Sequence, residues 1–124
     1  MGSEAMECGR GLSAVIARCW SATATLEQAP AYVHHFNSAV VVELERIQGY
    51  QGGYLLQREA PNGVEIVVIT LWDSLDSIRS FAGHDIDHAV VAEEAALLLS
   101  EFDRRVKQYE VTLSCGRPRP NPSR

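Results

Sequence analysis

One stretch, Val64 to Phe81, carries the most specific fold signal in this chain, because a strand-like run passes through Trp72 straight into a helix-like run. In its first part, VEIVVITLW, both alternating sets of side chains are largely apolar. A strand with one face in water would instead alternate apolar with polar residues. The pattern therefore predicts a strand that is covered on both faces.

The run after Trp72 predicts a helix over 74–82. Its apolar residues recur at helical spacing, so one face of this helix can pack on the sheet. Asp73 or Ser74 can cap its first turn, and Gly83 follows as its stop.

The rest of the chain divides into elements separated by turn signals. Asn62-Gly63 readily supplies the positive φ of a tight turn, so it predicts a β-hairpin. The expected elements are a strand over 14–20, a helix over 26–48, hairpin strands over 50–59 and 64–73, a second helix over 88–102 and a strand over 105–113. Together with the helix at 74–82, this order is that of a ferredoxin-like split βαβ fold of the α+β class, with a four-stranded antiparallel sheet.

Two local irregularities are expected. The branched side chains of Val40 to Val42 lose rotamer freedom in a helix, so the first helix should kink or break near them. Gly52 and Gly53 lie at the start of the first hairpin strand, where they predict a β-bulge.

Length and charge exclude several classes of protein. The 124 residues predict one domain over 13–113, with flexible tails over 1–12 and 114–124 where Gly, Pro and polar residues gather. The net charge of −5 argues against a nucleic acid or an acidic membrane as partner, because such binders gain affinity from clustered Lys and Arg.

Cysteine content and hydropathy indicate a compartment. The three cysteines are an odd number and do not form a disulfide framework, so a reducing environment fits best. No apolar run reaches the length of a membrane span, and the first residues lack the apolar block of a secretion signal. We therefore expect a cytoplasmic protein with no membrane partner.

Four separate segments carry a resemblance to a known family. ARCW in the first strand, GYQGGYLLQRE in the hairpin, ITLWDSLDSIRSFAG, and the closing VKQYEV are similar to the antibiotic biosynthesis monooxygenases. The resemblance covers 14–112 and implies a homodimer, in which two four-stranded sheets meet to form a dimeric α/β barrel. It also implies a small-molecule pocket between each sheet and its own helices.

The heme-degrading branch of that family uses an Asn, a Trp and a His in one pocket. Aligned without gaps through Leu71-Trp72, those positions fall here on Ala17, Phe81 and Val91. None of the three matches, and no imidazole is present at that place to ligate iron. We therefore expect no heme degradation, and the family resemblance implies a protein that uses no cofactor.

The resemblance implies cofactor-independent oxygenation of an aromatic or polyketide-like small molecule. In that chemistry the deprotonated substrate itself reduces oxygen, so the protein supplies an apolar cavity and a proton acceptor. His35 and His88 are the candidate catalytic residues. The candidate substrate-binding residues are four aromatic side chains, Tyr32, Phe36, Trp72 and Phe81.

Each candidate also has a structural interpretation. His34 and His35 point about 100° apart on a helix, so one can face a pocket while the other faces water. His84 and His88 have the spacing of a metal pair on a helix, but Gly83 and the intervening aspartates favour a capping element, and we expect no metal.

Arg18 is unusual on a strand that is expected to be covered. A buried Arg usually has a partner, and an ion pair with Glu59 or Glu110 is favoured over an anion site. Two further functions stay open for the whole protein: a non-catalytic barrel that binds a small apolar ligand, and an isomerase or cyclase that uses the same pocket.

Overall fold

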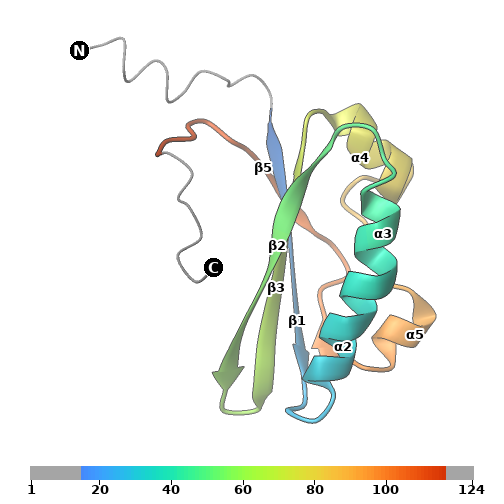
Figure 1. The fold of residues 1–124 in the computed structure, drawn as a ribbon, viewed down its shortest axis with the longest axis vertical. Coiled ribbons are helices and arrows are strands. Elements are labelled where there is room, and N and C mark those ends of the chain that lie inside the picture. The colour runs from blue at the N-terminus through green and yellow to red at the C-terminus, as the bar shows by residue number, and fades with distance from the viewer. Residues whose placement is uncertain (1–14, 117–124) are drawn as a thin grey trace, which may run out of the picture.

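One antiparallel sheet forms a layer of the molecule, and the helices form a second layer on one of its sides (Figure 1). The computed structural model describes residues 15–116, so the tail expected over 1–12 and residues 117–124 of the tail expected over 114–124 lie outside the described residues. The strands are β1 (Ile16–Ala24), β2 (Tyr50–Ala60), β3 (Gly63–Trp72), β4 (Glu101–Phe102) and β5 (Lys107–Glu110).

The strand order is β2-β3-β1-β4, and β5 also pairs with β1. Both short strands lie along the same edge of β1, with β4 opposite Ala22 and β5 opposite Ile16 to Cys19. Together they fill the fourth position of the sheet, which confirms the ferredoxin-like α+β fold and its four-stranded antiparallel plan.

The first helical segment is continuous but irregular. It consists of α2 (Ala29–His35), a π-helical turn η1 (Phe36–Val40) and α3 (Val41–Leu44). The irregularity expected near Val40 is confirmed, and it takes the form of a widened turn instead of a break in the chain.

The strand-to-helix junction after β3 follows the prediction. Helix α4 (Leu75–Ala82) begins after Ser74, whose side chain accepts a hydrogen bond from the backbone N–H of Ser77 at 3.1 Å. Gly83 ends the helix with φ +90°, in the left-handed region that glycine adopts without strain.

The hairpin of β2 and β3 is also confirmed, and its register runs from Ala60↔Gly63 to Gly53↔Thr70. The register shifts between Tyr50 and Gly53, which is the expected bulge. A side chain at Gly53 would meet the backbone oxygen of Ile69 at 2.3 Å, so the bulge requires glycine there.

The helix expected over 88–102 is wrong in extent, because only α5 (Glu93–Ala96) is helical and β4 takes the end of the segment. The backbone before α5 has partners outside any helix. The N–H of Ala89 donates to the carbonyl of Arg104 at 3.0 Å, and His88 forms an isolated bridge with Arg105. These contacts hold the chain extended where side-chain periodicity alone predicted helix.

The two faces of β3 differ in burial. Val64, Ile66, Val68, Thr70 and Trp72 are buried under the helices, and the residues between them are only partly buried. We call these the covered face and the open face of the sheet.

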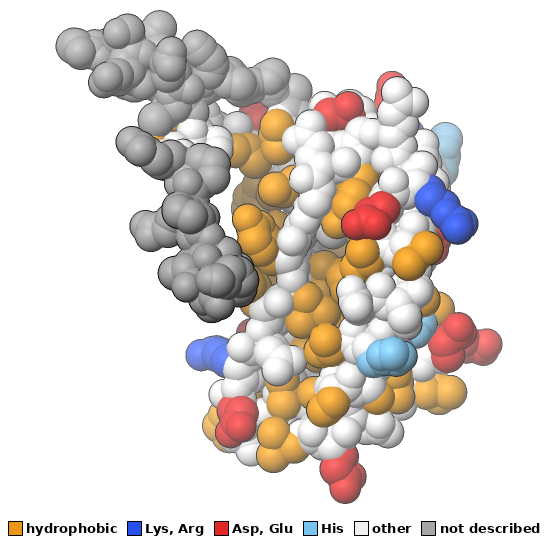
Figure 2. Space-filling view, in the orientation of Figure 1, with side chains coloured by type: hydrophobic (Ala, Val, Ile, Leu, Met, Phe, Trp, Pro, Cys, Tyr) orange, Lys and Arg blue, Asp and Glu red, His pale blue; other side chains and the backbone are white. Residues whose placement is uncertain are grey.

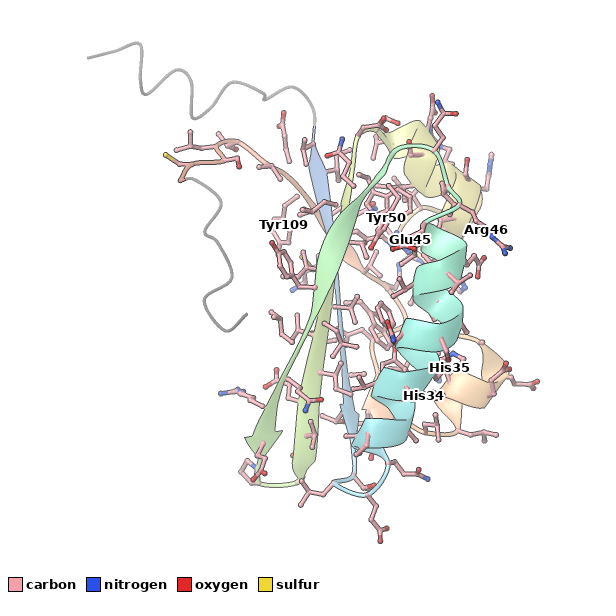
Figure 3. All side chains as sticks on the ribbon, in the orientation of Figure 1. His34, His35, Glu45, Arg46, Tyr50 and Tyr109 are labelled. Atoms are coloured by element: carbon pink, nitrogen blue, oxygen red, sulfur yellow. The ribbon has the colours of Figure 1, made fainter. Side chains whose placement is uncertain are left out.

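Apolar side chains continue across the open face onto the neighbouring strands. Tyr54 and Leu56 on β2 and Tyr109 on β5 lie on this face and are 62%, 48% and 54% exposed. Figure 2 shows hydrophobic side chains at the surface beside the strands, and Figure 3 shows Tyr109 on the side of the sheet away from the helices.

Two sequence expectations concern cysteines and membranes. Cys19 on β1 is a free thiol, but Cys115 is disulfide-bonded, which disagrees with the expectation of a chain without a disulfide framework in a reducing environment. Cys8 lies outside the described residues. Within 15–116, no helix has the length and apolar character that crossing a membrane requires.

Candidate active site

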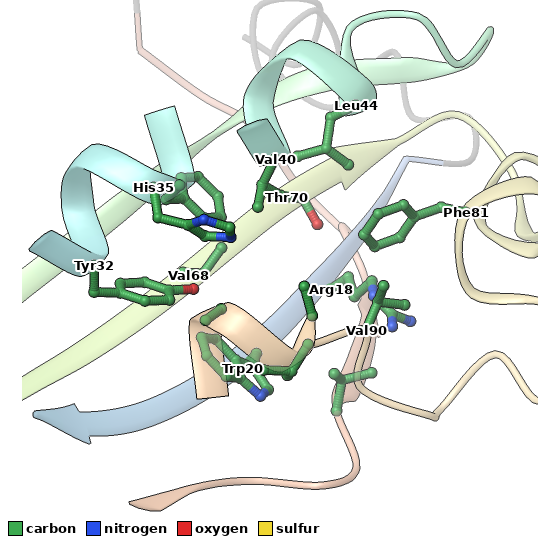
Figure 4. A pocket seen from close by; sticks show the side chains of 15 residues that line it. Arg18, Trp20, Tyr32, His35, Val40, Leu44, Val68, Thr70, Phe81 and Val90 are labelled. Carbon is green, nitrogen blue, oxygen red and sulfur yellow. The ribbon is translucent and has the colours of Figure 1, made fainter. Parts of the chain in front are cut away.

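A cavity of about 60 Å³ lies between the covered face of the sheet and the helices (Figure 4). That volume has room for a few water molecules. Arg18 and Trp20 on β1, with Val68 and Thr70 on β3, form its floor. Among the residues that line the cavity, Val90 and Ala92 are exposed, so the cavity opens to solvent at the extended segment before α5.

Side chains from the first helical segment form the roof. Tyr32, Phe36, Val40 and Leu44 all line the cavity although they span three turns. Four residues of an α-helix overshoot one full turn by about 40°, so a regular helix would carry these side chains progressively around its axis. The wider π turn between Phe36 and Val40 offsets this drift and keeps the four on one face.

His35 lies at the junction of α2 and the π turn and lines the cavity. Its Nε2 atom is buried and has no hydrogen-bond partner among the described residues. A buried polar atom without a partner is costly, and such atoms call for a functional explanation. His34, its neighbour, is exposed, which agrees with the expectation that the two histidines face different surroundings.

Arg18 projects from β1 into the same space and is only 4% exposed. Its Nη1 donates to the backbone oxygen of Ile86, and its Nη2 donates to that of His88 at 2.7 Å. The expected ion pair with Glu59 or Glu110 is wrong, because the Arg18 side chain points to the covered face, where neither of those carboxylates hydrogen-bonds or ion-pairs with it.

The electrostatic surroundings of Arg18 are incomplete. Burial lowers the pKa of the guanidinium, and the charge of Asp87 acts in the opposite direction. Asp87 forms no ion pair with Arg18; its Oδ1 accepts from Gln108 Nε2 at 2.7 Å, and its Oδ2 lies 3.8 Å from Arg105 Nη2. The ring of Phe81 lies 5.8 Å from the guanidinium carbon, within the range of a cation–π contact.

The structure brings three of the four expected aromatic residues to the cavity: Tyr32, Phe36 and Phe81. Tyr32 is buried, which raises its pKa to about 12. Trp72 is fully buried behind Phe81, with the ring centroids 5.8 Å apart, and it does not line the cavity. It supports the wall, and its Nε1 donates to Thr70 Oγ1 at 2.9 Å.

His88 lies elsewhere. Its side chain is exposed and is not among the residues that line the cavity; only its backbone oxygen reaches the site, through Arg18. The neighbouring Asp85 forms a bidentate ion pair with Arg105, at 2.8 and 3.1 Å. Over residues 15–116, no group of three or more His, Cys, Asp or Glu side chains is placed to hold a metal ion.

Sequence reasoning missed the cavity roles of Arg18 and Thr70. The available signal was their shared parity: Arg18 pairs with Thr70 across β1 and β3, so both point to the face that β3 buries. By the same alternation, Ala17 lies on the open face. The gapless alignment therefore matched a pocket position to Ala17, whereas the neighbouring residue, Arg18, is the one that faces the cavity.

The site can perform limited chemistry with its own side chains. An imidazole nitrogen without a partner can accept a proton, a guanidinium can attract negative charge, and the remaining walls are apolar. The arrangement suits a ligand that is planar and ionisable.

No protein-family model matches the sequence, and no curated protein sequence matches it either. Solved structures do match the fold. A Bacillus cereus protein assigned by name to the antibiotic biosynthesis monooxygenases is 15% identical, with a TM-score of 0.61 over 86% of this chain and 100% of that one.

Two Streptomyces structures align over most of the chain with TM-scores of 0.53. The monooxygenase from ActVA-Orf6 of Streptomyces coelicolor, in complex with nanaomycin D, is 14% identical, and the alignment covers 93% of this chain and 99% of that one. SnoaB of Streptomyces nogalater, a cofactor-independent oxygenase, is 15% identical, with 88% and 100% covered. The chain therefore has the fold of the antibiotic biosynthesis monooxygenases.

Proposed function

We propose that this protein is a cofactor-independent monooxygenase that acts on an aromatic or polyketide-like small molecule in the cavity under the first helical segment. The observation that carries the proposal is the buried, unpartnered Nε2 of His35, which faces an otherwise largely apolar cavity. The fold shared with a cofactor-independent oxygenase supports it.

The reaction balances without an added electron donor. His35 Nε2 takes a proton from a methylene group that two aromatic rings activate, and the resulting carbanion gives electrons to O₂ and forms a C–O bond. The proton returns to the peroxide. Loss of the second C–H proton with the departing hydroxide leaves one oxygen atom as a carbonyl and releases the other as water.

Substrate entry requires the cavity to widen, because about 60 Å³ is too small for a fused-ring molecule. The mouth is suited to this. Val90 is 44% exposed, and the segment from Val90 to Ala92 is not helical. Movement of this segment would enlarge the cavity without disturbing the sheet.

Oxygen uptake with an anthrone or a hydroquinone tests the proposal. We expect consumption without added flavin, metal or heme, and His35→Ala should lower the rate by about 10² or more, the usual contribution of a general base. His34→Ala is the matched control, because it removes an exposed imidazole from the adjacent position, and its rate should equal that of the wild type.

The outcomes separate the alternatives. A lower rate of oxygen consumption in His88→Ala, with an unchanged rate in His35→Ala, would show that His88 is the base. Turnover of no aromatic compound would contradict the oxygenase and support a ligand-binding protein. Proton exchange at carbon without oxygen uptake would support an isomerase or cyclase that uses the same imidazole.

We also propose that two subunits associate through the open face to form a dimeric barrel. The open face carries Val67, Ile69 and Leu71 at its centre, with the exposed Tyr54 and Leu56 beside them. An exposed apolar patch of this kind on a soluble domain marks an interaction surface. A second copy would bury the same residues and explain why both faces of β3 are apolar.

A further inference from the structure

We infer that the ligand of the cavity is an anion: an aromatic molecule whose carboxylate or phenolate oxygen accepts hydrogen bonds from Arg18. The inference rests on the proposed function in that it takes the same cavity as the substrate site. It adds the charge of the substrate and the residue that binds that charge.

The first step in the argument is that Arg18 is a buried cation without an ion-pair partner. Only 4% of its surface is exposed, and no carboxylate among residues 15–116 forms an ion pair with it. Its hydrogen-bond acceptors are the neutral backbone oxygens of Ile86 and His88. Buried charges are normally paired, so the positive charge here is left for another molecule to neutralise.

The second step concerns the donors that remain. A guanidinium carries five N–H groups, and the two backbone oxygens use only part of them. The ring of Phe81 lies 5.8 Å from the guanidinium carbon, and such a contact occupies the face of the group. The in-plane N–H groups can then donate to an oxygen that enters the cavity.

The third step excludes the nearest internal anion. Asp87 is held by Gln108 at 2.7 Å and lies 3.8 Å from Arg105, so its carboxylate is already engaged away from Arg18. The same network fixes the loop whose carbonyls orient the guanidinium. The loop therefore holds one side of the Arg18 guanidinium, while the other side of the group faces the cavity.

The other walls specify the rest of the ligand. Trp20, Phe36 and Val68 offer apolar surfaces, and His35 presents its unpartnered nitrogen. Figure 4 shows His35 from the helix and Arg18 from the strand on opposite sides of the cavity. A flat ring between them can place an anionic oxygen at Arg18 and an ionisable C–H or O–H group at His35.

A pair of isosteric probes tests this inference on the wild-type protein. Benzoate carries a charge at pH 7 and benzamide does not, and both are smaller than a fused-ring molecule, so they require less widening of the cavity. We expect calorimetry to show benzoate binding about 10- to 100-fold more tightly, the range expected for a charge-assisted hydrogen bond. Equal affinities, or no binding of either probe at millimolar concentration, would overturn the inference.

Variants assign the preference to Arg18. Arg18→Met should bind both probes equally, and Arg18→Lys should keep part of the preference. Arg46→Met removes the same charge from an exposed position and should behave as the wild type. A folded Arg18→Met protein that still prefers benzoate would show that another group binds the anion.

A second measurement needs no variant, in case Arg18→Met fails to fold once the loop at Ile86 loses its anchor. In ¹H–¹⁵N spectra of the wild-type protein, benzoate should shift the Nε–H signal of Arg18 and benzamide should leave it in place. An unchanged signal at saturating benzoate would overturn the inference. 4-Nitrophenol distinguishes the two oxygen sources, because its visible absorbance should show the phenolate enriched on the protein if phenolates bind as carboxylates do.

The two proposals fail in different ways. Absence of oxygen uptake with the anion preference intact would refute the monooxygenase and leave the anion site. If the wild-type protein binds both probes with equal affinity and Arg18→Met leaves oxygen uptake unchanged, the anion site is refuted and the monooxygenase remains.

Discussion

The covered face and the open face of the sheet are built from the same strands, yet the face under the helices is the one that buries a charged side chain. Arg18 and Thr70 are both buried on the covered face. The open face carries Val67, Ile69 and Leu71 at the corresponding positions of β3 and is only partly buried. Residue polarity alone therefore does not identify which face of such a sheet is covered by the helices of the same chain.

The difference between the faces has a physical reason. The covered face surrounds a cavity, and a cavity that binds an ionisable ligand needs polar atoms within an apolar frame. The open face is apolar around Val67, Ile69 and Leu71 and carries the Arg58–Glu65 ion pair toward the hairpin turn, and an apolar centre with charges at the edge is expected for a surface that a second subunit covers. Burial on the first face is observed, and burial on the second is our proposal.

The largest expected effect on stability lies on the covered face. Trp72 is fully buried against Tyr50 and Phe81, so Trp72→Ala should lower the free energy of unfolding by about 3–5 kcal/mol, because it removes a large side chain and leaves a cavity. Urea denaturation measures it. Tyr54→Ala removes an aromatic ring from the open face and should cost less; an equal or greater cost would reverse the comparison between the faces.

A smaller effect on subunit stability, but a change in mass, is expected from the open face. The wild type should sediment at twice the chain mass at micromolar concentration. Leu56→Asp should sediment as a monomer, because a carboxylate buried without a partner at an interface costs several kcal/mol. Gln57→Asp adds the same charge at the next position of β2, on the other side of the strand, and should remain dimeric. A monomeric wild type would contradict the proposed barrel.

The smallest effect at neutral pH, and one that appears only in alkali, concerns Tyr32. Burial on the covered face raises its pKa from the ordinary 10.0 to about 12. Between these values the unfolded chain releases the phenolic proton while the folded protein keeps it, so stability falls as pH rises from 10 to 12. Below pH 10 the contribution is constant.

Urea denaturation at a series of pH values measures this loss. Tyr32→Phe keeps the ring but has no ionisable group, so its stability should fall less steeply over the same interval. Parallel curves for Tyr32→Phe and the wild type would show that the hydroxyl is not held neutral by burial.

Local signals in the sequence were sufficient for most of the fold. Asn62-Gly63 and Ser74 act on their immediate neighbours, through a turn and a cap, and their effects were predicted correctly. The segment before α5 was not, because its conformation depends on partners distant in sequence. Arg18 binds the carbonyls of Ile86 and His88, and no pattern within 86–102 reports that contact.

The site followed the same division. Helical geometry predicted that His34 and His35 face different surroundings, but only the tertiary structure shows that His35 reaches the cavity and that the side chain of His88 does not. Trp72 was expected in the wall and instead lies one layer behind it, because Phe81 stacks in front. Sequence patterns placed residues on faces, and packing decided their depth.

The π turn at Phe36–Val40 has a consequence for how the first helical segment can change in length. A π turn contains one more residue than the α-helical turn it replaces. Deletion of Ser38, which is exposed, would let the segment close into a regular α-helix, in which the seven steps that remain between Phe36 and Leu44 turn through about 700°, close to two full turns. Phe36 and Leu44 would therefore still share one face, while β1 and β3 kept their register. The turn thus absorbs the gain or loss of one residue and leaves the roof of the cavity facing the sheet.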